Sequence, residues 1–261
     1  TAVIGPDAQL ADDVHVGPYC VIDGPVRLGS GCELQSHVTI VGDTTVGAGN
    51  RFFPGAVIGT PPQDLKHQPE HAVRLVIGDG NLFREHVTVH AGTAVDRGVT
   101  EVGSNNLFMV GSHVAHDCQV GDGVVLANHV LLAGHITVND RAILNGASAC
   151  HHFTSIGRMA YVGGLTRITQ DVHPFTIVEG HPARVRACNV IGLQRAGVPA
   201  EDVEIVRRAV REILVSDRRT ASEAIEQVEA RHPDHALTAE LIASVRAAAA
   251  GRQGRAQEPQ R

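Results

Sequence analysis

Residues 102–144 read VGSNNLFMVGSHVAHDCQVGDGVVLANHVLLAGHITVNDRAIL, and this stretch decides the fold. Every sixth residue in it is apolar: Val102, Phe108, Val114, Val120, Leu126, Leu132, Val138 and Leu144. A spacing of six does not fit a helical face, whose apolar positions recur every three or four residues, but it fits a short strand followed by a corner. The stretch therefore predicts hexads stacked as parallel strands in a β-solenoid.

The same period extends in both directions from this stretch. It begins at Ile4 and continues to Ile168. Two segments interrupt it, one at about 60–76, which contains three prolines, and a short polar one at 94–101. We expect both to be loops that leave a regular stack, and such loops often carry function.

The period alone gives neither the number of hexads in a turn nor the handedness of the path, and crossover rules favour a right-handed one. The pattern resembles the hexapeptide-repeat acyltransferase superfamily, in which three hexads, or 18 residues, form each triangular coil of a left-handed parallel β-helix. The resemblance implies a mainly β fold of this kind, with a helical domain at its C-terminal end.

We expect the solenoid to occupy residues 1–181. The repeat then stops, and residues 182–250 show helical spacing instead. The expected helices are Pro199–Arg211, Thr220–Ala230 and Thr238–Ala250. Thr220 with Glu223 forms a capping-box signature at the start of the second helix. Residues 251–261 have no large apolar anchor, so we predict a disordered tail there.

Composition restricts the class of protein. The 261 residues are 43% hydrophobic, which excludes wholesale disorder, yet they contain no tryptophan and only 3% aromatic residues. Small side chains suit a narrow, repetitive interior. No stretch of about 18 apolar residues occurs, and residues 1–30 lack the basic start and apolar run of a signal peptide. We therefore expect a cytoplasmic protein with no stable membrane insertion.

Cysteine content and charge argue against further classes. The five cysteines are odd in number and show no C-x-x-C pair, so neither a disulfide framework nor a zinc ribbon is indicated. A net charge of −6 argues against a nucleic-acid-binding protein, because phosphate contacts need a basic surface. An acidic protein partner would need a local basic patch on this chain.

A repeat fold does not require imidazoles, yet five histidines fall within three predicted coils: His113, His116, His135, His151 and His152. At 18 residues per coil, His116, Gly134 and His152 are in vertical register. Asp117 then lies under His135. His116 is a candidate general base, because an imidazole removes protons near neutral pH and the adjacent Asp117 can fix its tautomer. The amide of Gly134 is a candidate oxyanion donor, since glycine lets another group approach closely.

Other interpretations of the histidines remain open. The chain has 16 histidines, so some clustering is expected, and any one of them can be a surface residue. Gamma-class carbonic anhydrases share this solenoid and bind zinc through histidines spaced H-x-x-x-x-H. No two histidines in this sequence have that spacing. We therefore predict no metal site.

Several motifs are similar to those of the UDP-N-acetylglucosamine acyltransferases, the family that opens lipid A biosynthesis. They are SHVAHDC at 112–118, LAN at 126–128, LAGH at 132–135, QDLK at 63–66, VTVH at 87–90, Gly92 with Thr93, Asn189, Gly192 with Leu193, and Arg195. The likeness spans essentially the whole chain. It implies transfer of an (R)-3-hydroxyacyl group from acyl carrier protein to the 3-hydroxyl of UDP-N-acetylglucosamine, by a homotrimer whose active sites lie between subunits.

The resemblance implies a role for each matching residue. His116 would be the general base, Asp117 its orienting partner and Gly134 the oxyanion donor. The residues that would bind the sugar, the diphosphate or the acyl chain are Asp64, His90, His113, His135 and His151. Asn189 and Arg195 would lie near the nucleotide. Gly164 would form the floor that measures the acyl chain, and a glycine there leaves room for a longer chain.

Three positions depart from the family's pattern. His152, Ala91 and Ile191 stand where the family often has glutamine, arginine and glutamate. All three would lie around the acceptor, with His152 among the substrate-binding residues. The 3-amino analogue of the sugar nucleotide therefore stays an alternative acceptor.

Two rival functions also remain. The N-acyltransferase that acts later in the same pathway has an extra N-terminal domain, whereas the hexads in this sequence already begin at Ile4. A non-enzymatic scaffold gives no reason for the candidate catalytic residues to converge. The arginines that could dock the acidic carrier protein are Arg158, Arg167, Arg184, Arg186 and Arg195.

Overall fold

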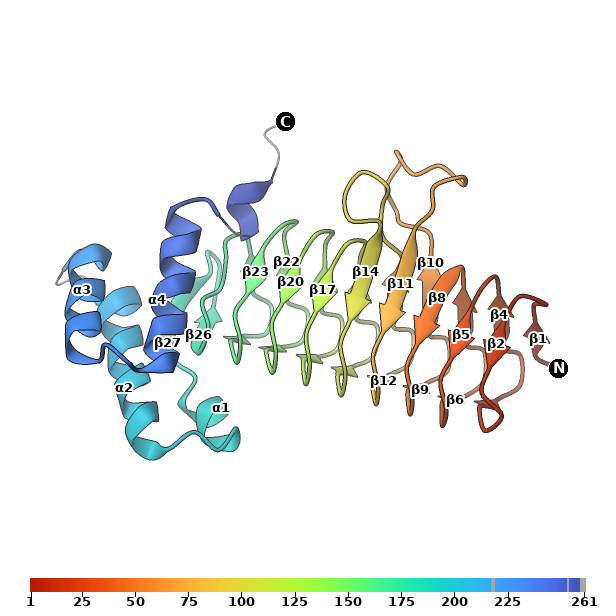
Figure 1. Ribbon diagram of the computed structural model, residues 1–261, viewed down its shortest axis with the longest axis horizontal. Coiled ribbons are helices and arrows are strands. Elements are labelled where there is room, and N and C mark those ends of the chain that lie inside the picture. The colour runs from red at the N-terminus through yellow and green to blue at the C-terminus, as the bar shows by residue number, and fades with distance from the viewer. Residues whose placement is uncertain (217–218, 253, 259–261) are drawn as a thin grey trace.

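The computed structural model describes residues 1–216, 219–252 and 254–258. They form a left-handed parallel β-helix followed by a helical domain. Figure 1 shows the coils stacked along the long axis of the molecule, with the helices gathered at the C-terminal end of the stack. This is the mainly β architecture that the hexads and the resemblance predicted.

Three sheets form the three sides of the solenoid, and within each sheet consecutive strands of the stack are hydrogen-bonded. Sheet A contains β1 (Val3–Ile4), β4 (Val21–Asp23), β7 (Thr39–Val41), β10 (Val57–Thr60), β13 (Thr88–His90), β16 (His113–Val114), β19 (Leu131–Leu132), β22 (Ala149–Cys150) and β25 (Arg167–Ile168). Sheet B contains β2 (Gln9–Leu10), β5 (Arg27–Leu28), β8 (Asp43–Val46), β11 (Arg74–Ile77), β14 (Val99–Val102), β17 (Gln119–Val120), β20 (Thr137–Val138) and β23 (Ser155–Ile156). Sheet C contains β27 (Arg184–Cys188), β26 (Thr176–Glu179), β24 (Tyr161–Val162), β21 (Ile143–Leu144), β18 (Val125–Leu126), β15 (Leu107–Phe108), β12 (Leu82–Phe83), β9 (Arg51–Phe52), β6 (Glu33–Leu34) and β3 (His15–Val16).

Each strand of the repeat pairs with the strand three places along the chain, so a coil contains three strands. Val3 pairs with Val21, at the spacing predicted for three hexads. In most two-residue strands the first side chain points outward and the second is buried. The inward side chains form one continuous core, in which the rings of Phe52, Phe83 and Phe108 stack 4.8 Å apart. That distance matches the separation of neighbouring strands, so the core repeats with the backbone.

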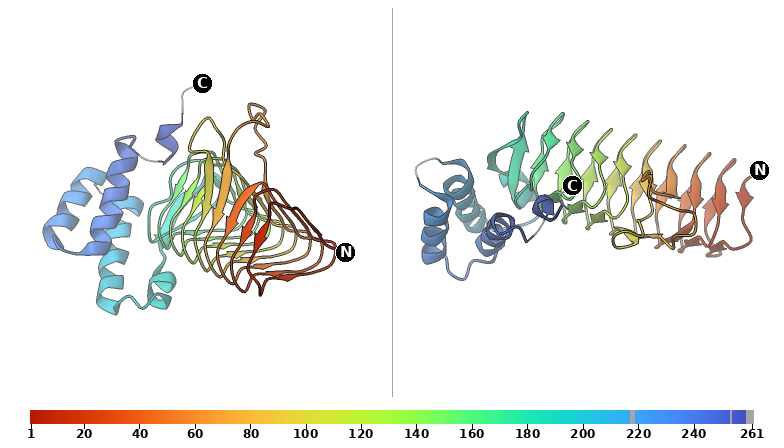
Figure 2. Two further views of the ribbon diagram at one scale, coloured as in Figure 1. Left: turned by 45° about the vertical axis from the view of Figure 1, so that its right-hand side comes forward. Right: turned by 90° about the horizontal axis from the view of Figure 1, so that it is seen from above.

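Both insertions lie on the same edge of the solenoid, between sheets A and B, which we call the A/B edge. Residues 61–73 connect β10 to β11, and residues 91–98 connect β13 to β14. Strand pairing continues across both, since Ile77 pairs with Val46 on one side and with Val102 on the other. Figures 1 and 2 show the two loops protruding side by side. The two insertions therefore add polar residues to the A/B edge while the strand pairing of sheets A and B stays continuous.

The corners of the coils have an unusual backbone conformation. The second corner residue often has a positive φ, and at many corners it is not glycine, as at Asp117 (φ 58) and His135 (φ 63). Aspartate, asparagine and histidine enter this region more readily than most other residues. Polar side chains are thereby placed where two sheets meet.

The C-terminal helices pack on the last coils of the solenoid. They are α1 (Val190–Arg195), α2 (Ala200–Val210), the π-helical turn η1 (Arg211–Val215), α3 (Ala221–Arg231), α4 (Ala236–Ala249) and the 3-10 turn η2 (Gly254–Gln257). Thr220 and Glu223 exchange hydrogen bonds at the start of α3, so the predicted capping box is confirmed. Phe175 of the solenoid shares a buried apolar cluster with Leu193 and Val206. Among the described residues, no helix has both the length and the apolar character needed to span a membrane.

The end of the solenoid differs from the expected boundary after residue 181. β27 lies beyond that residue and pairs antiparallel with β26, so strand structure continues where the repeat pattern stops. Within the predicted disordered tail, residues 253 and 259–261 lie outside the described residues. Gly254–Gln257 forms a turn, and the Arg255 N–H donates to Asp171 Oδ1 at 3.0 Å. This bond ties the turn to the last coil.

Candidate active site

The residues predicted to be catalytic meet at the A/B edge in two neighbouring coils. His116 and Asp117 form the corner between β16 and β17, and Gly134 occupies the equivalent corner between β19 and β20. His116 Nδ1 lies 2.9 Å from Asp117 Oδ2, with the imidazole 12% exposed and the carboxylate fully buried. A buried carboxylate at this nitrogen favours the tautomer that carries its hydrogen on Nδ1. The Nε2 lone pair is then available to accept a proton.

Asp117 is held in place by two threonines. Both carboxylate oxygens accept from the Thr93 N–H, at 3.0 and 3.1 Å, and Oδ2 also accepts from the Thr93 hydroxyl at 2.6 Å. The Asp117 N–H donates to Thr100 Oγ1 at 2.8 Å. Burial raises the pKa of the Asp117 carboxyl, but the hydrogen bonds from His116 and Thr93 outweigh it, so the pKa lies below its usual value. Asp117 is therefore a fixed, ionised acceptor.

Gly134 lies directly against the imidazole of His116. A Cβ at this position would come within 2.4 Å of His116 Cε1, so the ring could not lie where it does beside a larger residue. Among the described residues, the Gly134 N–H donates no hydrogen bond. The same holds for Asn128 and Gly146, which are first corner residues on another edge of the solenoid. The free amide is thus a property of solenoid corners, and the contact with His116 is specific to Gly134.

His90 and His113 form a second pair of imidazoles beside this corner. Their rings meet edge to face at 4.8 Å, and His113 Nδ1 lies 2.7 Å from Thr88 Oγ1. Burial, with smaller effects of His113 and His116, lowers the pKa of His90 to about 4. Burial and then His116 also lower the pKa of His113. Both rings are therefore neutral at pH 7, and His90 Nδ1 is buried without a partner among the described residues.

His135 lies in the corner above Asp117 and is oriented from three sides. Its Nδ1 lies 2.5 Å from Asp96 Oδ2 in the second loop. Its ring stacks on Phe153 at 4.3 Å, with an interplanar angle of 2°, and meets His116 edge to face at 4.9 Å. The sequence register placed His135 over Asp117, and the structure has Nδ1 of His135 3.9 Å from Asp117 Oδ2.

His151 and His152 occupy the next corner along the A/B edge. Their rings meet edge to face at 5.5 Å, and His151 Nδ1 lies 3.3 Å from the carbonyl oxygen of His152. The structure thus lines up three consecutive corners that carry histidines, as the 18-residue register predicted.

Two other predicted residues come from other parts of the chain. Asp64 is in the loop at 61–73, where its Oδ1 accepts from the Lys66 N–H at 2.9 Å. Gly164 is exposed at a corner between sheets C and A, which is a different edge of the solenoid. A Cβ at Gly164 would meet only the Gly146 carbonyl oxygen, at 3.3 Å.

Asn189 and Arg195 border a groove of about 720 Å³ between α1 and the outer face of sheet C. The groove is lined by Gly123, Val125, Arg141, Ile143, Met159, Tyr161, Ile177, Asn189, Ile191, Gly192, Arg195 and Ala196. Asn189 is the N-cap of α1: its Oδ1 accepts from the Gly192 N–H at 3.0 Å, and its Nδ2 donates to the Met159 carbonyl at 2.9 Å. In this chain Asn189 therefore anchors the helix that forms one wall.

Sequence reasoning missed four residues that contact the site. Phe153 follows His135 by one coil, so the register that aligned the histidines contained the signal for it. Thr93 was noted only as part of a family motif, and Thr100 and Asp96 only as members of a loop. Their contacts depend on the path of residues 91–98, which the hexad register does not describe.

Known protein families and enzymes are similar to this chain in sequence. A family model described as UDP-N-acetylglucosamine O-acyltransferase, domain 2, matches residues 171–254, and the bacterial hexapeptide-transferase repeat matches residues 7–42 and 99–134. An acyl-[acyl-carrier-protein]–UDP-N-acetylglucosamine O-acyltransferase of Sinorhizobium fredii is 46% identical over 82% of this chain and 78% of that protein. The enzyme of the same name from an Anaeromyxobacter species is 43% identical over 93% of both.

The chain belongs to the UDP-N-acetylglucosamine O-acyltransferase family. Solved structures agree with this assignment. The Francisella novicida UDP-N-acetylglucosamine acyltransferase has a TM-score of 0.90 and 32% identity, covering 97% of this chain and 91% of that one. The family member from Bacteroides fragilis has a TM-score of 0.90 and 37% identity, covering 94% and 95%.

A metal-binding interpretation can be tested on the same atoms. His116, Asp117 and His135 each offer a donor atom within 4.8 Å of the others, a spacing that could hold an ion. Asp117, however, already accepts hydrogen bonds from His116 and Thr93, and His135 Nδ1 is bonded to Asp96. The Asp117 carboxylate and His135 Nδ1 therefore already have protein partners, with which a metal ion at these atoms would compete.

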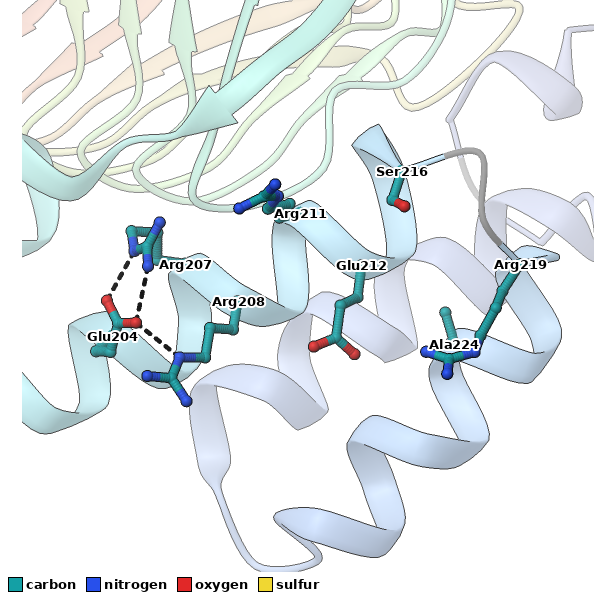
Figure 3. A pocket seen from close by; sticks show the side chains of 8 residues that line it. All are labelled: Glu204, Arg207, Arg208, Arg211, Glu212, Ser216, Arg219 and Ala224. Carbon is teal, nitrogen blue, oxygen red and sulfur yellow. Dashed lines mark hydrogen bonds and ion pairs between the residues drawn. The ribbon is translucent and has the colours of Figure 1, made fainter.

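A second hollow, of about 380 Å³, lies within the helical domain (Figure 3). Its lining consists of Glu204, Arg207, Arg208, Arg211, Glu212, Ser216, Arg219 and Ala224. Hydrogen bonds from Arg207 and then Arg208 lower the pKa of Glu204 to about 2. The opposite charges in this hollow partly neutralise each other, and none of the predicted site residues lies in it.

Proposed function

We propose that this protein transfers an (R)-3-hydroxyacyl group from acyl carrier protein to the 3-hydroxyl of UDP-N-acetylglucosamine, the first step of lipid A biosynthesis. The observation that supports this most directly is the buried His116–Asp117 pair lying against Gly134, whose N–H is free among the described residues. The names of the relatives specify the same donor, the same acceptor and an oxygen nucleophile.

In the proposed reaction His116 Nε2 takes the proton of the sugar hydroxyl as its oxygen attacks the thioester carbonyl. Asp117 holds the hydrogen on Nδ1 and stabilises the imidazolium that forms. The Gly134 N–H donates to the oxyanion of the tetrahedral intermediate. Collapse breaks the carbon–sulfur bond, and the departing thiolate receives the proton from His116. The thioester drives the transfer, so the reaction needs no cofactor.

The remaining polar residues are proposed to hold the substrates. His90, His113, His135, His151 and His152 surround the catalytic corner, and imidazole nitrogens can form hydrogen bonds with sugar hydroxyls. Asp64 would contact the sugar from the loop at 61–73, and Gly164 would leave room for a long acyl chain. A competition assay with carrier-bound acyl chains of different length tests the last point, because preference for short chains contradicts it.

We also propose that the active enzyme is a cytoplasmic homotrimer. The outward residues of sheets A and C are largely apolar or small, whereas those of sheet B are largely polar. In sheet C they begin with the polar His15, Glu33 and Arg51 and continue with Leu82, Leu107, Val125, Ile143, Tyr161 and Ile177. In sheet B they run Gln9, Arg27, Thr45, Val76, Glu101, Gln119, Thr137 and Ser155. A ring of three chains would bury sheet A of one chain against sheet C of the next and leave sheet B in water.

This arrangement would complete the active site. In such a ring the A/B edge of one chain, with its histidines, comes next to the B/C edge of its neighbour. The groove beside Asn189 and Arg195 borders that second edge, through Gly123 and Arg141. Arg195 is also the arginine we favour for contact with the acidic carrier protein, since Arg158 is already paired with Glu240.

The test is an assay of the purified protein with 3-hydroxyacyl carrier protein and UDP-N-acetylglucosamine, read by mass spectrometry. We expect an ester product and a loss of about 10²- to 10⁴-fold in rate for His116→Ala, the usual contribution of a general base. Mild alkali cleaves an ester and spares an amide, so the same assay run with the 3-amino sugar nucleotide tests the alternative acceptor. Failure with both acceptors would contradict the proposal.

A further inference from the structure

We propose that Thr93 is a positioning residue for the acyl transfer, acting through Asp117 on the general base His116. The proposal rests on the function proposed above. It comes from a contact that hexad register does not predict, between a loop residue and the carboxylate of the catalytic pair.

Thr93 supplies most of the hydrogen bonds that Asp117 receives. Its N–H lies within 3.1 Å of both carboxylate oxygens, and its hydroxyl lies 2.6 Å from Oδ2. The only further donor to this carboxylate among the described residues is His116 Nδ1, at 2.9 Å from the same Oδ2. Thr93 and the buried carboxylate are 2% and 0% exposed, so no water shell stands in for these bonds. Thr93 therefore fixes the oxygen to which the catalytic histidine is bonded.

Thr93 is also the point that organises the second loop. Its carbonyl oxygen accepts from the Gly98 N–H at 3.0 Å and from the Asp96 N–H at 3.3 Å. The two ends of the loop touch, because a Cβ on Gly92 would lie 2.2 Å from the Val99 nitrogen. The loop is thus a closed ring with two contacts to the site, Thr93 with Asp117 and Asp96 with His135, and the first of these gives Thr93 a defined position.

The Thr93 hydroxyl has a chemical consequence for His116. A donor on Oδ2 disperses part of the negative charge that faces the imidazole. Without it, the carboxylate stabilises the imidazolium more strongly, so the base keeps its proton to a higher pH. The carboxylate also becomes free to rotate, which disturbs the orientation of the ring. Loss of the hydroxyl should therefore change both the rate and its pH dependence.

The experiment compares Thr93→Val, Thr93→Ser and the parent protein in the acyl-transfer assay across a range of pH. We expect Thr93→Val to lower kcat by about tenfold to a hundredfold with KM little changed, since orientation is lost while binding is kept. The acid limb of its pH profile should move to higher pH. Thr93→Ser restores the hydroxyl and should recover most of the rate and the parental profile.

Thr44→Val is the matched control. Thr44 is as buried as Thr93 and its hydroxyl donates to the Val41 carbonyl at 2.7 Å, but it lies on β8, away from Asp117. It should keep the parental kcat and pH profile. If Thr93→Val folds poorly, Thr93→Ala removes the same hydroxyl without adding a methyl group in its place.

A double-mutant cycle with Asp117→Asn separates this proposal from the proposed function. Thr93 acts through Asp117, so Thr93→Val should cost far less in the Asp117→Asn background. An active parent whose rate and pH profile survive Thr93→Val would overturn the proposal, and so would equal losses in both backgrounds. An inactive parent would instead count against the proposed function.

Discussion

The His90 side chain is buried and lies beside other imidazoles, and its Nδ1 has no hydrogen-bond partner in the part of the chain that the structure describes. Its pKa of about 4 means that the folded protein binds a proton at this site less readily than the unfolded chain, whose histidine has its ordinary pKa of 6.5. Protonation therefore favours unfolding. At neutral pH the His90 imidazole is mainly uncharged in both the folded and the unfolded protein, so its low pKa hardly changes the free energy of unfolding there.

We expect the free energy of unfolding to fall as the pH is lowered from about 6.5 to about 4, and His90 to contribute to that fall. His90→Asn has no such titration, so its unfolding free energy should depend less on pH across the same window. Urea denaturation at a series of pH values measures this. Parallel curves for the two proteins would show that His90 titrates normally.

Gly134 gives a second test at the scale of one residue. Gly134→Ala places a Cβ 2.4 Å from His116 Cε1, which must displace the ring, and we expect about a hundredfold loss of kcat. Gly146→Ala is the control, because Gly146 is also a first corner residue but lies between sheets C and A, and its Cβ would lie 3.5 Å from the nearest atom. Circular dichroism should show that both variants fold. Equal rates would mean that the ring does not need this space.

Most strands of the solenoid are only two residues long. Hydrogen bonds of buried polar side chains at the corners connect one coil to the next. Three asparagines in successive coils, Asn50, Asn81 and Asn106, are buried inside one edge. Asn81 Oδ1 accepts from the Asn106 N–H at 2.9 Å, and Asn81 Nδ2 donates to Asn50 Oδ1 at 2.9 Å. Each amide satisfies polar groups of a neighbouring coil.

Asn81→Ala should therefore lower the free energy of unfolding by about 2 kcal/mol or more, because it leaves buried donors and acceptors on both neighbours unpaired. Asn128→Ala alters an exposed corner and should change stability by no more than about 0.5 kcal/mol. Thermal or chemical denaturation distinguishes the two. A small effect at Asn81 would mean that water replaces its bonds.

Some elements of the fold could be predicted from the sequence and others could not. The hexads predicted the stacked strands and their inward residues, because both follow from one fixed period. The 18-residue coil came from the family resemblance, and with it the register predicted the alignment of His116, Gly134 and His152 and the position of Asp117 under His135. The inserted residues 91–98 have no period, so Thr93 and Asp96 could not be assigned contacts. Likewise β27 lacks the hexad pattern because it runs antiparallel, and its pairing depends on a turn that no periodicity encodes.

Through its middle coils the solenoid presents two sides with mainly apolar or small outward residues and one side with mainly polar ones, and the proposed trimer follows from that difference. The helical domain lies beyond the last coils, so it leaves most of these sides uncovered (Figure 2). Leu131, on sheet A, is 49% exposed in the single chain.

The trimer can be tested by its mass and by substitution of one outward residue. Light scattering should give three times the 27.6 kDa chain mass for the parent protein. Leu131→Glu should shift the mass towards the monomer and lower the rate, because a charge would be buried at the interface. Thr137→Glu on sheet B should alter neither. A parent protein that is monomeric and active would contradict the proposed trimer.

Active sites shared between chains predict complementation. His116→Ala and Arg195→Ala should each be poorly active alone, yet chains produced together should regain about a quarter of the parental rate, since that share of randomly mixed interfaces pairs both intact residues. Separately purified proteins mixed without subunit exchange serve as the control. No recovery in true mixed trimers would place both residues in one chain's site.

The antiparallel strand β27 has a consequence for solubility. A stack of parallel coils resembles the core of a fibril, and a terminal coil with a parallel edge could template the first coil of another molecule. β27 reverses the direction of the chain at that end of sheet C, so the last edge of this sheet is no longer a continuation of the parallel stack. The helical domain packs against the same coil. The reversed strand and the helices therefore replace the regular repeat at the C-terminal end of sheet C, where another parallel coil would otherwise find a matching edge.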